Sequence, residues 1–290
     1  MCRGNPPVVA PFSLFLKVKL ESNNPKFNRL SMITSQSNTL NTTAILSELI
    51  KIQEQNSSCR LWQFRSLISA NQYRRLYQYF LKYVPQGSEV LDWGCGNGHF
   101  SYFLASSGYK TSGFSFEDFC LRSSLNNVAY QFKQGSWEEP TAIPFSDNQF
   151  NAIVSVGVLE HVRETGGSEI TSLKEISRLL KPGGIFICYH FPNQFSLIEA
   201  IASRLPNKYH HQYRYTRASI EALCQATGFE VLDIKRYGFL PRNMWGVFPK
   251  PIRNSQWLAY IWDLLDDALS YPFSLVCQNY LFVVRKPFTE

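Results

Sequence analysis

The stretch VLDWGCGNG, at residues 90–98, decides the fold of this 290-residue chain. A short apolar strand ends at Asp92 and runs into glycines at 94, 96 and 98, after which a helix is predicted. Glycine lets the backbone turn sharply and approach a ligand that a Cβ atom would exclude. An acid at the carboxyl end of such a strand points into the crevice where doubly wound sheets bind nucleotides. The spacing D-x-G-x-G-x-G differs from the dinucleotide fingerprint G-x-G-x-x-G, which is the neighbouring interpretation.

Strands and helices alternate on both sides of this turn. Strands are predicted at 89–92, 110–114, 128–133, 150–156 and 185–189, and helices at 98–107, 116–125 and 170–180. This alternation is typical of βαβ units, which build a parallel sheet. Two further strands, at 229–237 and 274–285, are expected as antiparallel neighbours at the end of the sheet. The predicted fold class is therefore α/β: a Rossmann-like doubly wound sheet, mostly parallel and seven-stranded with an antiparallel last strand, and helices on both faces.

Composition excludes several other classes of protein. With 44% hydrophobic and 18% charged residues, the chain can bury a core and is not a disordered sequence. No apolar run approaches the roughly 18–20 residues of a membrane-spanning helix. The seven cysteines are odd in number and scattered, which argues against a disulfide framework or a zinc site. They fit a reducing compartment, so a cytoplasmic location is expected.

Three more stretches follow the glycine turn in order: GYKTSGFSFEDF at 108–119, IPFSDNQFNAIVSVGVLEHV at 143–162 and LLKPGG at 179–184. Together with VLDWGCGNG they resemble class I S-adenosylmethionine-dependent methyltransferases, in particular the methyltransferase type 11 group and its ubiquinone/menaquinone-biosynthesis relatives. The resemblance implies an enzyme whose cofactor is S-adenosyl-L-methionine, and it extends over residues 90–184.

The resemblance also implies which residues hold the donor. Asp92 would face its cationic amino group, and Gly94, Cys95 and Gly96, with Gly98, would hold the methionine moiety. The acid that chelates the ribose in such sites is replaced by Ser115, and Glu117 either substitutes for it or is a first-turn helix charge. Phe116 would pack on the adenine. Ser136 and Trp137 stand where relatives have an acid that reads the adenine amine, and Trp137 either stacks on the ring or belongs to the core. Val156 is the last residue implied.

Glu160 and His161 follow the fourth predicted strand, where the family has the sulfonium. An imidazole there would take a proton from the attacking acceptor, and its ordinary pKa suits a base. The alternative is that the pair ends the strand and orients the next loop. Related ubiquinone O-methyltransferases carry E-x-x-E-H, which is associated with a divalent metal. Gly157 replaces the first acid here, and no metal site is predicted.

The chain is predicted to consist of a poorly ordered tail at 1–40, with a true start at Met1 or Met32, and a methyltransferase domain at 41–290. Within the domain, 41–85 would form N-terminal helices and 88–190 the donor-binding core. Residues 191–217 and 239–273 would cover the acceptor side. The first of these contains PNKYHHQYRYT, whose aromatics and Arg214 or Arg217 would bind a flat or anionic acceptor. His210 and His211 are alternative metal ligands there, but no carboxylate or cysteine lies at ligand spacing.

The net charge of +7 is unevenly distributed. Residues 36–190 hold thirteen Lys/Arg and thirteen Asp/Glu, whereas 191–253 hold nine and four. This pattern favours a small-molecule or lipid-like acceptor, anionic in character, with peripheral membrane contact and no nucleic acid. The predicted reaction is methyl transfer to an oxygen, carbon or nitrogen by in-line displacement. The alternatives are a non-catalytic methyltransferase-like binding module and an RNA or DNA methyltransferase.

Overall fold

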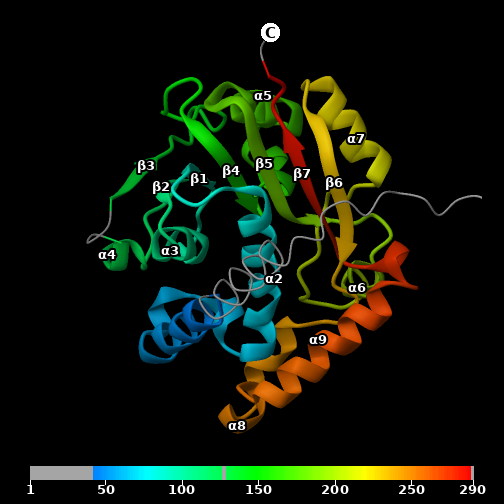
Figure 1. The fold of residues 1–290 in the computed structure, drawn as a ribbon. Coiled ribbons are helices and arrows are strands. Elements are labelled where there is room, and N and C mark those ends of the chain that lie inside the picture. Colours follow the sequence, from blue (N-terminus) through cyan, green and yellow to red (C-terminus); the bar gives the residue numbers. More distant parts are fainter. Residues whose placement is uncertain (1–41, 126–128, 289–290) are drawn as a thin grey trace, which may run out of the picture. The chain divides into compact units, whose positions relative to one another are not determined.

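A computed structural model of the chain describes residues 42–125 and 129–288, all within the unit Asn38–Glu290. The tail predicted at 1–40 and the two candidate starts lie outside the described residues. Seven strands form one sheet in the order β3-β2-β1-β4-β5-β7-β6 (Figure 1). They span Glu89–Trp93 (β1), Lys110–Ser115 (β2), Tyr130–Gln134 (β3), Phe150–Val156 (β4), Leu180–Pro192 (β5), Glu230–Tyr237 (β6) and Asn279–Arg285 (β7). Neighbouring strands are parallel except at β7, which is antiparallel to β5 and β6. The predicted fold class is confirmed.

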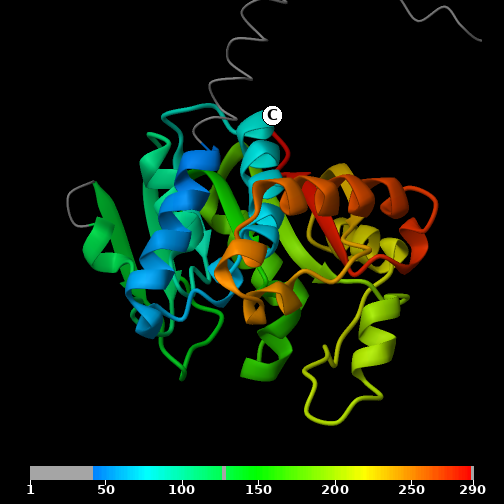
Figure 2. The same cartoon turned by 90° about the horizontal axis from the view of Figure 1, so that it is seen from below.

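Helices cover both faces of the sheet (Figure 2). Alternate strand residues point to opposite faces of the sheet. Val90 therefore belongs to a core with the first helix (42–55) and the helices at Leu67–Tyr83 and His99–Ser106. Leu91 belongs to a core on the other face, with the helices at Glu169–Leu179 and Arg217–Ala226. No helix of the described residues is long and apolar enough to cross a membrane. The α-helices are Leu67–Tyr83 (α2), His99–Ser106 (α3), Arg122–Leu125 (α4), Glu169–Leu179 (α5), Leu197–Ala202 (α6), Arg217–Ala226 (α7), Lys250–Arg253 (α8) and Gln256–Ser270 (α9). The 3-10 helices are Ser57–Cys59 (η1), Trp62–Phe64 (η2), Leu159–Thr165 (η3), Asn243–Val247 (η4) and Ser274–Val276 (η5).

The segment after β2 differs from its prediction. A helix was expected over 116–125, but only α4 is helical. Phe119 is buried, and its ring lies where a Cβ on Gly98 would fall. Cys120 is joined to Cys59 by a disulfide with a Cα–Cα distance of 5.1 Å. Tertiary packing therefore overrides helix propensity here. The expectation that no disulfide would form is wrong for this pair, because the fold brings together two cysteines that are 61 residues apart.

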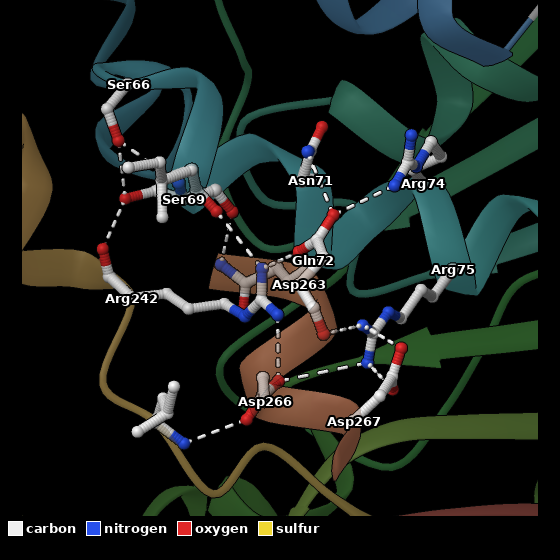
Figure 3. Close-up of polar contacts among 12 residues, drawn as sticks. Ser66, Ser69, Asn71, Gln72, Arg74, Arg75, Arg242, Asp263, Asp266 and Asp267 are labelled. Carbon is white, nitrogen blue, oxygen red and sulfur yellow. Dashed lines mark hydrogen bonds and ion pairs between the residues drawn. The ribbon is translucent and has the colours of Figure 1, made fainter. Parts of the chain in front are cut away.

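A buried polar cluster attaches the 239–273 insertion to α2 (Figure 3). The guanidinium of Arg242 pairs with Asp263 at 2.6 Å and with Asp266 at 2.8 Å. Asp263 also accepts hydrogen bonds from Asn71 at 3.0 Å and Arg74 at 2.8 Å, both on α2. The carboxylates thus tie α9 to α2 and hold Arg242, which directly precedes η4.

Candidate functional site

A cavity of about 580 Å³ lies at the carboxyl ends of β1, β4 and β5. Asp92 and the turn after it form one wall, and Val156 and Gly157 follow from β4. Side chains from α2 and α6 and the first residue of η4, Asn243, also line the cavity. The central sheet and the late helical segments therefore meet at this cavity. It lies where ligands bind in doubly wound sheets.

The glycine turn is shaped by its backbone. The backbone N–H groups of Gly94 and Cys95 donate to the carbonyl of Phe114 on β2, at 2.8 and 3.0 Å. Gly94 has a φ of +71°, and a Cβ there would lie 2.5 Å from the Cγ2 of Val158. Gly96 has a φ of +54°, and the nearest atom to a Cβ there would be the Gly94 oxygen, at 3.7 Å. The turn therefore leaves open space beside Gly96, on the lining of the cavity.

Asp92 is the buried acid of this wall, with 1% of its surface exposed. Its Oδ2 accepts a hydrogen bond from Ser101 on α3 at 2.7 Å. Among the described residues it has no ion pair, and burial raises the pKa of its carboxyl to about 7. A cationic group bound in the cavity would restore the ionised form, because an opposite charge favours a carboxylate.

The residues expected on the adenine side lie together but away from the lining of the cavity. Phe116 and Trp137 stack with ring centroids 4.4 Å apart, and Trp137 is 61% exposed. The hydroxyl of Ser115, at the end of β2, accepts the backbone N–H of Glu117 at 3.4 Å. The hydroxyl of Ser136 likewise accepts the backbone N–H of Glu138. Their predicted role in donor binding stays a prediction.

Glu160 and His161 reach the cavity from η3, directly after β4. Burial raises the pKa of Glu160 to about 8, and its Oε2 has no hydrogen-bond partner among the described residues. The Nδ1 of His161 lies 3.1 Å from Glu164, and its Nε2 lies 3.9 Å from Glu160. The pair thus combines an unsatisfied buried carboxyl with an imidazole that faces the cavity.

Three more histidines line the cavity, so four of the five in the chain meet there. His99 and His190 were missed by the sequence reasoning. Burial lowers the pKa of both to about 3, so they are neutral. His190 has a φ of +67°, and its Nδ1 lies 3.0 Å from the hydroxyl of Tyr237. The signal that could have identified His190 as a site residue is its position directly after the apolar strand predicted at 185–189.

Residues of the segment after α6 line two different pockets. Tyr209 and His211 line the cavity, whereas Arg214 lies at a second, open pocket beside α7. Arg217 is exposed and pairs with Glu221 at 2.8 Å. Tyr209 and His211 therefore face the site, and the two arginines that the sequence predicted as anion binders do not line it.

Residues 62–234 match the model of a family described as a methyltransferase domain. The chain belongs to this methyltransferase family. It is 23% identical to demethylmenaquinone methyltransferase of Staphylococcus carnosus, over 63% of this chain and 86% of that protein. It is 31% identical to the probable tRNA methyltransferase 9B of Mus musculus, over 46% of this chain but 31% of that protein. Among solved structures it resembles 1,6-didemethyltoxoflavin-N1-methyltransferase of Burkholderia thailandensis, with 16% identity, coverage of 96% and 100%, and a TM-score of 0.51. That likeness shows the fold.

The methyltransferase is thus an enzyme. Two features of the cavity fit S-adenosylmethionine, the methyl donor that the sequence resemblance implies. Asp92 is a buried carboxyl that lacks a cationic partner among the described residues, and the donor carries an ammonium group. The space beside Gly96, which a side chain would fill, allows a ligand to approach the backbone.

Proposed function

We propose that this methyltransferase transfers the methyl group of its donor to an oxygen, carbon or nitrogen of a small or lipid-like acceptor, by in-line displacement. The observation that carries the proposal is that one cavity is lined both by the glycine turn and by the Glu160–His161 pair. When bound, S-adenosylmethionine supplies an electrophilic methyl group on a sulfonium. The protein then contributes alignment and a water-poor site, and such positioning is worth roughly 7–11 kcal/mol.

Asp92, Gly94, Cys95 and Gly96 would hold the donor against the end of β1. Val156 would close the donor side at the end of β4. These five residues all line the cavity. We also assign to donor binding the residues that lie outside that lining, namely Gly98, Ser115, Phe116, Glu117, Ser136 and Trp137.

His161 would accept the proton of an acceptor hydroxyl through Nε2, because its Nδ1 is engaged by Glu164. Glu160 would orient that ring from its buried position, 3.9 Å from Nε2. A general base of this kind contributes typically 10²–10⁴-fold to a rate. His161→Ala should therefore lower turnover and leave donor binding intact. Full activity of this variant with every acceptor found would exclude the role.

A lipid-like acceptor is supported by the two sides of α6. Ile198, Glu199 and Ala202 line the cavity. On the same short helix and its end, Leu197, Ile201 and Leu205 are each about half exposed, and the exposed bases Arg204 and Lys208 follow. Apolar side chains with neighbouring bases favour contact with an anionic membrane surface. The protein should co-sediment with anionic vesicles at low salt and less at high salt. No retention by any vesicle composition would remove the membrane part of the proposal.

A tRNA acceptor is the second candidate, because the chain is 30–34% identical to parts of tRNA methyltransferases. The chain spans a third or less of those relatives. The neutral charge balance of 36–190 favours the small acceptor. Binding of tRNA that weakens steeply with salt would favour the second candidate, since phosphate contacts release counterions.

Calorimetry with S-adenosylhomocysteine, the demethylated product, tests the donor half. The unmodified protein should bind it, and Asp92→Ala should lose at least about 100-fold in affinity, as expected for removing a charge-assisted contact at a buried site. Asp118→Ala is the matched control, because Asp118 is an exposed acid paired with Arg122 at 3.2 Å. An absence of heat at millimolar product would favour a non-catalytic module and overturn the proposal.

A further inference from the structure

We propose that Glu160, His161 and His211 form a binding site for a divalent transition-metal ion. One ligand atom from each residue lies within 4.8 Å of the others. Glu160 and His161 come from η3, whereas His211 comes from the segment after α6. The cluster faces the cavity, because all three residues line it. Small side-chain movements would bring the three atoms to the spacing of one coordination sphere.

Both imidazoles are held by a carboxylate on the opposite side of the ring. The Nδ1 of His161 lies 3.1 Å from Glu164. The Nδ1 of His211 lies 2.9 Å from Glu199, whose other oxygen accepts the backbone N–H of His211 at 2.8 Å. Metal-binding histidines usually donate their second N–H to a carboxylate, which fixes the tautomer and leaves Nε2 for the ion. This arrangement occurs twice here.

The third ligand lacks a partner. Glu160 is 3% exposed, and its Oε2 makes no hydrogen bond among the described residues. An unsatisfied buried carboxyl oxygen is costly, and a cation in the cavity would satisfy it. Three carboxylates, those of Glu160, Glu164 and Glu199, surround the two rings. The positive charge of Arg214 interacts with Glu199. The local charge thus favours a cation.

The ligand types indicate which ion would bind. Mg²⁺ and Ca²⁺ take oxygen ligands, whereas two imidazoles and a carboxylate suit zinc, ferrous iron, cobalt or nickel. Three protein ligands leave a coordination position open toward the cavity. With the ion bound, His161 would be a ligand and not the general base. An acceptor hydroxyl at the open position would release its proton to water, and the electron pair left on oxygen would form the bond to the methyl carbon while the carbon–sulfur bond breaks and its electron pair goes to the sulfur. This role rests on the proposed function, but the binding of the ion does not.

The competing explanation needs no ion: His161 and His211 would simply pair with their neighbouring glutamates. Titration of chelator-treated protein with Co²⁺ alone distinguishes the two, by calorimetry and by the visible absorption of bound cobalt. We expect one equivalent to bind, with absorption that shows nitrogen ligands, and Mg²⁺ in excess to leave it in place.

His211→Ala should weaken Co²⁺ binding by about 100-fold or more, and Glu199→Gln by about 10- to 100-fold, as found for outer partners of metal ligands. His210→Ala is the matched control, because His210 is exposed and its ring lies against only the Lys208 carbonyl among the described residues, at 3.5 Å. Its Co²⁺ affinity should not change. Glu160→Gln, which keeps the shape of the side chain, should weaken binding like His211→Ala.

The absence of stoichiometric Co²⁺ binding would overturn the site, as would equal losses in the His210 and His211 variants. Binding of S-adenosylhomocysteine, measured on the same samples, shows that each variant is folded. The same measurement separates the two proposals. If the unmodified protein does not bind S-adenosylhomocysteine, the proposed function is wrong; if it does not bind Co²⁺, the metal site is wrong.

Discussion

The glycine turn after β1 and the helical insertion at 239–273 line the same cavity, but they are held in different ways. The turn is fixed by its own backbone, through positive φ at Gly94 and hydrogen bonds to the adjacent strand. The insertion is fixed by side chains, through Arg242, Asp263 and Asp266 and their contacts with α2 (Figure 3). The turn, which we propose holds the donor, therefore depends on local backbone geometry. The insertion, which we propose covers the acceptor, depends on long-range packing.

Breaking the anchor of the insertion should have the largest effect. Arg242→Met would leave Asp263 and Asp266 buried without their main cation, and breaking such a pair costs about 3–5 kcal/mol of unfolding free energy. Lys250→Met is the control, because the Lys250 side chain is largely exposed and its pair with Glu54 is worth about 0–1 kcal/mol. Chemical denaturation measures both. Similar stabilities for the two variants would show that the insertion is held by something else.

The burial of Asp92 should make the stability of the protein depend on pH. The pKa of Asp92 is about 7 in the folded protein and near 3.8 when exposed, so the folded state retains a proton that the unfolded state loses. The contribution of Asp92 to the stability of the donor-free protein should therefore fall as pH rises from about 4 to about 7, by a few kcal/mol. Glu160, His99 and His190 also have shifted pKa values, so this contribution is measured as the difference between the unmodified protein and a variant at Asp92.

Asp92→Asn should remove this contribution and leave those of Glu160, His99 and His190, because the amide does not titrate and its oxygen can still accept from Ser101. Denaturation curves across this pH range provide the comparison. If the unfolding free energy of the variant changes with pH as it does in the unmodified protein, another group causes the effect.

The glycine turn itself can be probed by adding one methyl group. Gly94→Ala places a Cβ at positive φ and against Val158, so we expect a cost on the order of 2–4 kcal/mol in stability. Gly87→Ala is matched, since φ is +80° and nothing lies within 4 Å of the new atom. It should cost about 1–2 kcal/mol. Thermal unfolding separates them, and an equal cost would show that the contact with Val158 does not matter.

The smallest effect is expected at the stacked pair outside the cavity lining. Trp137→Ala should reduce the affinity for S-adenosylhomocysteine by about tenfold if its ring contacts adenine, as an aromatic contact of about 1.4 kcal/mol would. Trp257→Ala, at an exposed tryptophan of α9, is the control. Unchanged affinity at Trp137 would remove it from the donor site and confine donor recognition to the residues that line the cavity.

The sequence predicted the sheet well, because alternating strands and helices carry their own periodicity. Of its candidate site residues, Asp92, the glycines 94 and 96, Val156 and the Glu160–His161 pair line the cavity, and all lie at or within a few residues of the carboxyl end of a strand. It failed where distant segments meet. The Cys59–Cys120 disulfide, the short α4 and the place of His190 depend on packing between elements, which has no signal in local spacing.

By itself, the sequence determined the succession of strands and helices along the core and the position of the turn that lines the cavity, since glycine and strand periodicity act over a few residues. The tertiary structure alone decided what stands opposite that turn. It brought His99, His190 and His211 to one cavity with His161, and it placed ligand atoms of Glu160, His161 and His211 within 4.8 Å of one another, which sequence spacing did not predict. The physical reason is that these side chains meet across space, and the buried Arg242 cluster that holds the insertion in place joins residues far apart in the chain.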